Sequence, residues 1–152
     1  MPLKLKHENF RNTKSVKELT PAQQRFLEIG AQLHDSELTP ALARMLLQDA
    51  RTKHAYSVMD TDAPEGTDPV VGIVTLEAPG DDVHIDTLVI DEQRRGQRLG
   101  AGTLWLIEAL ARNNNAERIT LNPVSDDAGR FYEAHGYQSD GDSGDGMLSK
   151  RL

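Results

Sequence analysis

Three arginines and two glycines lie within seven residues of the chain, at Arg94, Arg95, Gly96, Arg98 and Gly100. Apolar residues precede them and a helix-like apolar spacing follows, so we expect a tight turn between a strand and a helix. Amide N–H groups at a helix start have no partner within the helix, and glycine lets an anion approach the backbone closely. Guanidinium groups beside such amides favour a phosphate or pyrophosphate. The pattern predicts an anion site, with an ordinary solvated turn as the alternative.

The distribution of charge supports this prediction. Nine acidic residues and no lysine or arginine lie between positions 61 and 92, shortly before the arginines. The whole chain carries a formal net charge of −7; residues 1–60 hold nine basic and seven acidic groups, and residues 61–152 hold eight and seventeen. Because the second half repels a phosphate backbone, we expect no general nucleic-acid binding and favour a cationic or amine-bearing partner.

The composition narrows the remaining classes of protein. The chain has 152 residues, 38% of them hydrophobic, and we expect one domain over residues 1–152. It has no cysteine, which excludes disulfides and thiolate chemistry, and its histidines lack ligand spacing, so we expect no metal site. No apolar run reaches the length of a membrane span and the N-terminus lacks a signal-peptide core, which predicts a cytoplasmic protein without membrane contact.

The elements that must hold the arginine-glycine turn follow from apolar periodicity and end signals. Residues 1–18 are expected to form an edge strand or a flexible arm. Thr20-Pro21 and Thr39-Pro40 each predict the start of a helix. The first helix is expected to run to about His34. The inward residues expected of the second helix are Leu42, Met45, Leu46 and Ala50.

The rest of the chain alternates between strands and helices. We expect strands at 56–59, 70–77, 83–90, 118–122 and 147–152. A helix is expected from Leu99 to the asparagines at 113–115, and another is capped by Ser125 and ended by Gly136. The expected inward face of the longer helix is Leu99, Thr103, Leu106 and Leu110. The order β, α, α, β, β, β, α, β, α, β, β predicts an α+β fold around a mixed sheet.

Two stretches resemble the Gcn5-related N-acetyltransferase (GNAT) family. The first, Arg95-Gly96-Gln97-Arg98-Leu99-Gly100-Ala101, is similar to the family's Arg/Gln-x-x-Gly-x-Gly/Ala acyl-CoA loop, and the second, residues 125–137, is similar to its Phe-Tyr-x-x-x-Gly-Tyr/Phe helix exit. The resemblance covers residues 70–138. It implies a mixed, mostly antiparallel sheet flanked by helices in a three-layer α/β/α sandwich, with acetyl-CoA or another acyl-CoA as co-substrate. The family's inner glycine is Arg98 here, which is expected to turn outward or to contact a phosphate.

The resemblance also implies roles for individual residues. Tyr132 is the implied general acid for the leaving thiolate, and the alternative is a packed ring with a structural hydroxyl. The implied oxyanion donor is a backbone N–H near Val89 or Ile90, where pantetheine would pair with the strand. For Ser125 and Arg130 the alternatives are a helix cap and a solvated face. The residues implied to bind the cofactor are Leu88, Val89, Ile90, Arg94, Arg95, Gly96, Gln97, Arg98, Leu99, Gly100, Ala101, Ser125 and Arg130.

The general base and the acceptor contacts are less defined. His84 and Asp86 lie two residues apart on one strand, and hence on one face, so both are candidate bases. The alternatives are a salt-bridged surface histidine and proton transfer through bulk water. Three acidic residues near the C-terminus are expected either to attract a cationic amine or to form a solvated hairpin; they are Asp140, Asp142 and Asp145.

These features predict acetyl transfer from acetyl-CoA to a primary amine, on a small molecule or a peptide. Because no nucleophile for an acyl-enzyme stands out, we expect direct attack within a ternary complex. Two alternatives are a non-catalytic acyl-CoA-binding module of the same fold and a toxin that acetylates aminoacyl-tRNA. The sequence leaves the acceptor, the acyl chain length and the choice between monomer and homodimer open.

Overall fold

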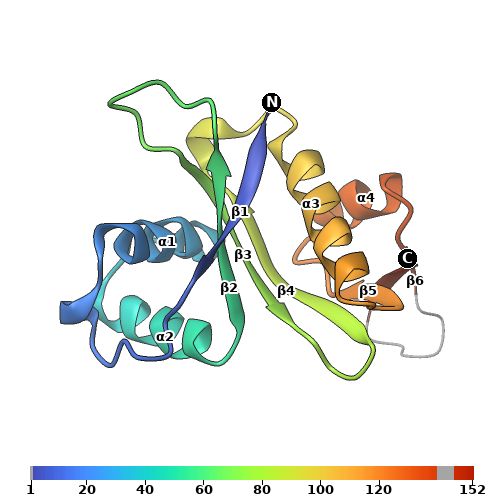
Figure 1. Cartoon of the computed structure of the whole chain (residues 1–152), viewed down its shortest axis with the longest axis horizontal. Coiled ribbons are helices and arrows are strands. Elements are labelled where there is room, and N and C mark those ends of the chain that lie inside the picture. The colour runs from blue at the N-terminus through green and yellow to red at the C-terminus, as the bar shows by residue number, and fades with distance from the viewer. Residues whose placement is uncertain (1, 140–145) are drawn as a thin grey trace. The chain divides into compact units, whose positions relative to one another are not determined.

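The computed structural model describes residues 2–139 and 146–152. Their strands form a seven-stranded open sheet in the order β1-β2-β3-β4-β5-β7-β6, accompanied by four α-helices (Figure 1). The predicted α+β class, with a mixed and mostly antiparallel sheet flanked by helices, is confirmed, and so is the predicted order of elements. No helix in this part of the chain is long and apolar enough to cross a lipid bilayer.

The bounds of the strands and helices are close to those predicted. In chain order they are β1 (Leu3–Glu8), η1 (Val16–Glu18), α1 (Pro21–Ala31), η2 (Gln32–His34), α2 (Pro40–Arg51), β2 (His54–Asp60), β3 (Val70–Glu77), β4 (Asp82–Ile90), η3 (Glu92–Arg94), α3 (Leu99–Asn113), β5 (Arg118–Leu121), α4 (Asp126–Ala134), β6 (Gln138–Ser139) and β7 (Leu148–Arg151), where η denotes a short 3₁₀ helix.

Contacts divide the chain into two compact units. The first comprises the described residues of Met1–Thr75 and Thr87–Thr103, and the second comprises those of Leu76–Asp86 and Leu104–Leu152. Strands β3 and β4 and helix α3 therefore contribute residues to both units. The expectation that the whole chain acts as one domain stays a prediction.

The two helices of the first unit begin where their Thr-Pro pairs predict. The Thr20 hydroxyl accepts from the Gln23 N–H at 3.1 Å while the Gln23 side chain accepts from the Thr20 N–H at 3.0 Å, a reciprocal capping box. The Thr39 hydroxyl accepts from the Leu42 N–H at 3.2 Å. Helix α1 ends at Ala31 and continues as η2 to the predicted end at 34.

The core of the first unit lies between its two helices and its strands. On α2 the buried residues are Ala43, Leu47 and Ala50, so the predicted inward face was wrong at Met45, which is 51% exposed. Both stripes have helical spacing, and the small alanines allow close packing. The buried cluster comprises Phe10, Phe26, Leu27, Ile29, Ala43, Leu47, Ala50, Ala55, Val70, Ile73 and Val89.

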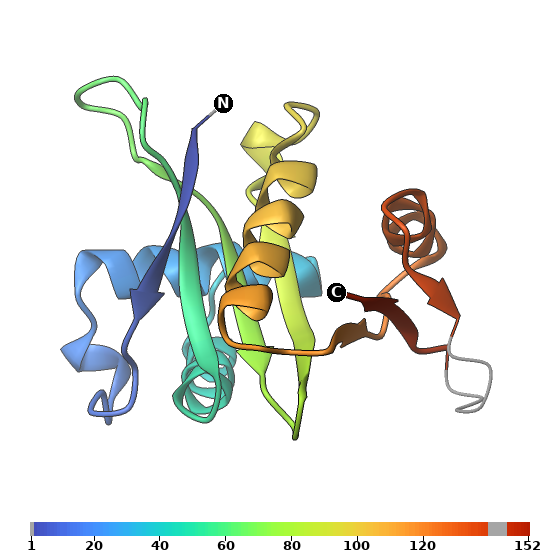
Figure 2. The ribbon, with the colours of Figure 1, turned by 45° about the vertical axis from the view of Figure 1, so that its right-hand side comes forward.

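In the second unit the strand pairing changes from parallel to antiparallel at β5. Strand β4 pairs in parallel with β5 from Asp82↔Arg118 to Ile85↔Leu121, and β7 pairs antiparallel with both β5 and β6 (Figure 2). Helix α4 begins at the predicted cap and ends before Gly136, whose φ of 94° is a conformation that favours glycine.

Helix α3 buries a face displaced from the predicted one. Leu99 and Thr103 are buried as expected, but Leu106 and Leu110 are only half-buried. The fully buried residues further along the helix are Leu104, Ile107, Glu108 and Ala111.

Candidate functional site

The arginine-glycine loop of the first unit, residues 91–98, begins at a buried aspartate. Asp91 is 4% exposed and its N–H donates to the Val71 carbonyl at 2.8 Å. Its carboxylate accepts from the Arg25 guanidinium at 2.5 Å and from the Gln32 carboxamide at 3.0 Å. The Gln93 N–H adds a longer bond at 3.4 Å. Helix α1 and η2 thus hold the first residue of the loop.

The environment of Asp91 keeps its carboxylate ionised. Burial by itself would raise the pKa of Asp91, but the hydrogen bonds from Gln32 and the Gln93 N–H and the charge of Arg25 together outweigh burial. The pKa of Asp91 is therefore below its ordinary value. The ionised carboxylate accepts strong hydrogen bonds from the donors around it.

Two of the three predicted anion-binding arginines also hold the loop itself. Arg94 forms an ion pair with the buried carboxylate of Asp60 at 3.1 Å and donates to the Gln97 side chain at 3.2 Å. The Arg95 Nε–H donates to the Ile90 carbonyl at 3.2 Å. The predicted binding role of these arginines stays a prediction, and two of their guanidinium groups already have partners in Asp60, Gln97 and Ile90.

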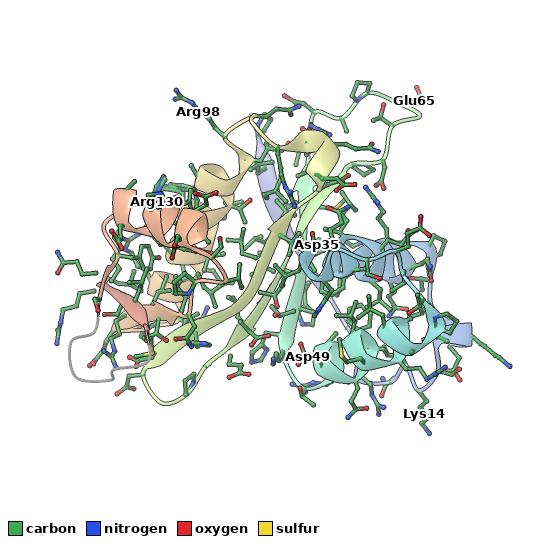
Figure 3. The ribbon with its side chains drawn as sticks, turned by 180° about the vertical axis from the view of Figure 1, so that it is seen from behind. Lys14, Asp35, Asp49, Glu65, Arg98 and Arg130 are labelled. Carbon is green, nitrogen blue, oxygen red and sulfur yellow. The ribbon has the colours of Figure 1, made fainter. Side chains whose placement is uncertain are left out.

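Arg98 has a left-handed backbone conformation. Its φ is 59°, a left-handed value that L residues other than asparagine and aspartate seldom adopt. The Arg98 side chain points away from the ribbon into solvent (Figure 3) and has no partner among the described residues. The side chain is turned outward here, and its contact with a phosphate stays a prediction. The backbone of the loop is therefore not covered by this side chain.

The loop ends in the free amides of α3. The first bond that closes a turn of this helix runs from the Gly102 N–H to the Arg98 carbonyl at 3.3 Å. The N–H groups of Leu99, Gly100 and Ala101 therefore have no carbonyl partner further back in the helix. Gly96, with φ of 83°, has no atom within 4 Å of the position that a Cβ would occupy. This end of the loop offers an anion open space and free donors.

Strand β4 extends beyond its pairing with β5. The parallel ladder ends at Ile85, five residues before the end of β4, and β5 itself ends there. Pro123 follows and has no N–H to extend the ladder. The predicted pantetheine-pairing residues, Leu88 to Ile90, lie beyond the last paired position of this ladder.

A glycine that the sequence analysis missed lies against this end of β4. A Cβ on Gly72 of β3 would lie 2.7 Å from the Val89 carbonyl oxygen and 3.0 Å from the Ile90 side chain. The close approach of the two strands therefore requires glycine at position 72. A glycine within the β-branched run of residues 70–75 was the available signal for it.

In the second unit, Tyr132 has an unpaired hydroxyl. The residue is 8% exposed and its ring contacts the rings of Phe131 and Tyr137 edge to face, with centroid distances of 5.1 and 5.7 Å. Among the described residues no group forms a hydrogen bond with its hydroxyl. Burial raises the pKa of Tyr132 to about 12. The phenol is therefore protonated at neutral pH and has a proton to donate.

The neighbouring Tyr137 shows the contrasting arrangement. Its hydroxyl donates to the buried Glu108 carboxylate at 3.0 Å. Burial and the Glu108 charge raise the pKa of Tyr137. Of these two tyrosines, Tyr132 is the one whose hydroxyl has no partner among the described residues.

The two candidate bases lie on the second-unit part of β4. The His84 Nδ1 lies 2.7 Å from the hydroxyl of the buried Thr120, its partner across the β4–β5 ladder. Asp86 follows two residues later and is exposed. Only the tautomer in which Nδ1–H donates to Thr120 leaves the Nε2 of His84 able to accept a proton.

Two predicted cofactor residues on α4 have local partners. The Ser125 hydroxyl caps the helix by accepting from the Ala128 N–H at 3.1 Å, and the exposed Arg130 pairs with Asp127 (Figure 3). Both partners correspond to the structural alternatives expected from the sequence. The acidic residues Asp140, Asp142 and Asp145 lie outside the described residues. Within residues 2–139 and 146–152, no three His, Asp or Glu side chains are arranged to hold a metal ion.

Comparison with known proteins identifies the family. The sequence model of the Acetyltransferase (GNAT) family matches residues 18–137, so the chain belongs to this family. An acetyltransferase from Thermus thermophilus superposes with a TM-score of 0.66 at 19% identity, covering 100% of this chain and 98% of that chain. The AtaTR structure bound with acetyl-CoA has a TM-score of 0.65 at 18% identity, covering 98% and 92%.

A further similar structure contains coenzyme A. The PaiA N-acetyltransferase from Thermoplasma acidophilum, in complex with coenzyme A, has a TM-score of 0.62 at 10% identity and covers 100% of both chains. At such low identities these structures show a shared fold. No curated protein matches the chain in sequence.

Proposed function

We propose that this protein is an N-acetyltransferase that transfers the acetyl group of acetyl-CoA directly to a primary amine. Membership of the family supports the reaction class, and the unpaired, protonated hydroxyl of Tyr132 is the observation that carries the proposal. A leaving thiolate needs a proton donor, and a buried phenol without a structural partner is suited to that role.

The loop and the start of α3 supply the groups for the cofactor's diphosphate. The free amides of Leu99, Gly100 and Ala101 and the unpaired Arg98 guanidinium are donors suited to it. Arg94 and Arg95 act mainly by holding the loop open in its observed shape. Residues Leu88 to Ile90 then pair with the pantetheine arm as a further strand would.

The chemical step divides among three groups of the chain. Acetyl-CoA supplies the activated acetyl group, whose carbonyl carbon is attacked by the neutral amine. The N–H of Val89 or Ile90 donates to the carbonyl oxygen as negative charge develops there. As the C–N bond forms and the C–S bond breaks, Tyr132 gives its proton to the departing sulfur.

The amine must lose a proton before or during attack. His84 is the better placed of the two candidate bases, because Thr120 fixes its ring and the tautomer described above leaves Nε2 free. Asp86 and relay through bulk water are the other routes for this proton. A cationic amine as acceptor is supported by the charges of residues 61–152, where acidic groups outnumber basic ones by seventeen to eight.

Replacing Tyr132 tests this proposal. We expect Tyr132→Phe to lower kcat by about 10²- to 10⁴-fold, the range of general acid catalysis, with the affinity for CoA unchanged. Turnover is measured as CoA released from acetyl-CoA with a panel of peptides, polyamines, aminoglycosides and amino acids. The matched control is Tyr56→Phe, which removes a half-buried hydroxyl in the first unit.

Three results would contradict it. Acetyl-CoA binding without CoA release for any amine would favour the non-catalytic binding module. Equal turnover in wild type and Tyr132→Phe would remove the phenol from the mechanism. Retention of tRNA at low salt, followed by its acetylation, would favour the toxin, which the negative charge of the second half opposes.

A further inference from the structure

We infer that Gln32 and Asp91 are positioning residues that couple the arginine-glycine loop, the proposed diphosphate site, to the segment joining α1 and α2. The inference rests on the proposed acyl-CoA binding. It is carried by the hydrogen bonds of a single carboxamide, all of them within the first unit.

The Gln32 side chain is bonded at both of its ends to consecutive residues of the loop. Its Nε2–H donates to the Asp91 carboxylate at 3.0 Å, and its Oε1 accepts from the Glu92 N–H at 2.9 Å. A carboxamide held in this way fixes both the position and the orientation of the peptide between Asp91 and Glu92. These contacts join residues about 60 positions apart in the chain.

The backbone of Gln32 bonds to the segment that joins α1 and α2. Its carbonyl accepts from the Asp35 N–H at 3.1 Å, which closes the turn η2. Asp35 has φ of 50° and starts the exposed segment that leads to α2 (Figure 3). Gln32 therefore bonds to the arginine-glycine loop through its side chain and to the segment leading to α2 through its backbone.

Arg25 reinforces the connection from one side. It lies on α1, seven residues before the C-cap Gln32, and its guanidinium pairs with Asp91 at 2.5 Å and with Asp68 at 2.8 Å. The carboxylate of Asp91 is charged and only 6% exposed. If the loop moved away, Arg25 and Gln32 would lose their hydrogen bonds to it. A shift of the loop on cofactor binding is thus transmitted to η2 and the residues that follow it.

The experiment compares two glutamines near the ends of the same helix. Gln32→Ala removes the bonds to the loop, whereas Gln23→Ala removes bonds to Asn9, Thr13 and Thr20 that do not involve it. We expect Gln32→Ala to weaken CoA binding about tenfold, equivalent to 1.4 kcal/mol. Gln23→Ala is expected to lower stability without changing the affinity of the folded protein. CoA affinity is measured by calorimetry, and stability by urea unfolding.

Hydrogen exchange supplies a readout that a purely structural role does not change. In the wild-type protein CoA is expected to slow amide exchange both in residues 92–101 and in residues 33–38. In Gln32→Ala only the loop should respond. Gln32→Glu places a carboxylate against the Asp91 carboxylate and should also weaken CoA binding. Adding Asp91→Asn should restore CoA binding, because the amide introduced at position 91 can donate to the carboxylate introduced at position 32.

The outcomes separate this inference from the proposed function. CoA binding by the wild type with unchanged affinity in Gln32→Ala, or with equal protection of residues 33–38 in both proteins, would overturn the coupling alone. If the wild type does not bind CoA, the proposed function and the coupling are both refuted. Failure of the double variant to recover while both single variants remain folded would also count against the hydrogen-bond mechanism.

Discussion

Arg98 has a left-handed backbone at the position where the resembled motif has glycine. The family's glycine is absent, yet φ of 59° preserves the turn and the side chain lies in solvent. The sequence shows arginine in place of the family's glycine and allows two alternatives for its side chain, but it does not determine the backbone dihedral. A left-handed conformation costs an L residue roughly 1–2 kcal/mol, which the surrounding loop contacts must offset.

Restoring glycine at this position separates backbone from side chain. We expect Arg98→Gly to be as stable as the wild type within about 1 kcal/mol, because relief of strain offsets the greater freedom of the unfolded chain. Arg98→Val should be less stable by about 1–2 kcal/mol, since a β-branched residue tolerates this φ poorly. Urea unfolding measures both. A clearly destabilised Arg98→Gly would contradict the left-handed backbone.

The same variant tests the anion role of the guanidinium. Arg98→Gly should bind CoA more weakly by up to about tenfold, and the difference should shrink at high salt because the lost contact is electrostatic. Arg98→Lys keeps the charge and is the matched control. CoA affinity that is identical in all three proteins at low salt would exclude Arg98 from phosphate binding.

The raised pKa of Tyr132 makes a prediction about pH. The folded pKa of about 12 lies above the ordinary value near 10, so the stabilisation of the neutral phenol is complete below pH 10 and is lost between pH 10 and 12. We therefore expect kcat not to fall between pH 7 and about 10 through loss of this proton. The measurement is kcat against pH, and a falling limb near pH 8 that disappears in Tyr132→Phe would contradict it.

At the scale of elements, starts and ends were predicted better than faces. Local chemistry sets helix starts, so Thr20 and Thr39 identified them from the sequence. The buried face depends on which stripe meets the sheet, and on α2 the apolar residues within 42–47 form two overlapping stripes. Met45 fell on the wrong side for that reason. Periodicity determines that a face is buried, but packing partners determine which one.

A buried ionic cluster joins α3 to the C-terminal strand of the second unit. The Glu108 carboxylate accepts from the Lys150 ammonium at 3.2 Å as well as from Tyr137, and Lys150 also donates to the His135 carbonyl at 3.0 Å. Removing one member of such a cluster leaves the others without their partner. We expect Glu108→Ala to lower the free energy of unfolding by about 2–4 kcal/mol.

A surface ion pair provides the comparison for that measurement. Asp127 pairs with Arg130 on α4, and the two side chains are 90% and 70% exposed (Figure 3). Asp127→Ala should cost less than about 1 kcal/mol, because solvent screens an exposed pair. Both variants are measured by urea unfolding. Equal costs would mean that the Glu108 cluster contributes no more than an ordinary surface contact.

At the scale of the whole molecule, the class of fold was predictable and the long-range polar contacts were not. The alternation of strands and helices specified the α+β order, and two motifs specified the family. The contact between Arg25 and Asp91 spans 66 residues, and nothing in the local pattern links the two. Arg25 and Gln32 therefore read as ordinary polar residues of a helix until the tertiary structure brings them to the loop.

The Asp91 network also makes the stability of the fold depend on pH. The pKa of Asp91 is lowered in the folded protein, so its contribution is complete above the unfolded value of about 4 and is lost as pH falls through the lower folded value. We expect the stability advantage of the wild type over Asp91→Asn to be constant from pH 7 to about 5 and to shrink below pH 4. Urea unfolding at a series of pH values measures it. An advantage that grows towards acid pH would mean that Asp91 is neutral in the folded state, and the charged anchor of the diphosphate loop would have to be abandoned.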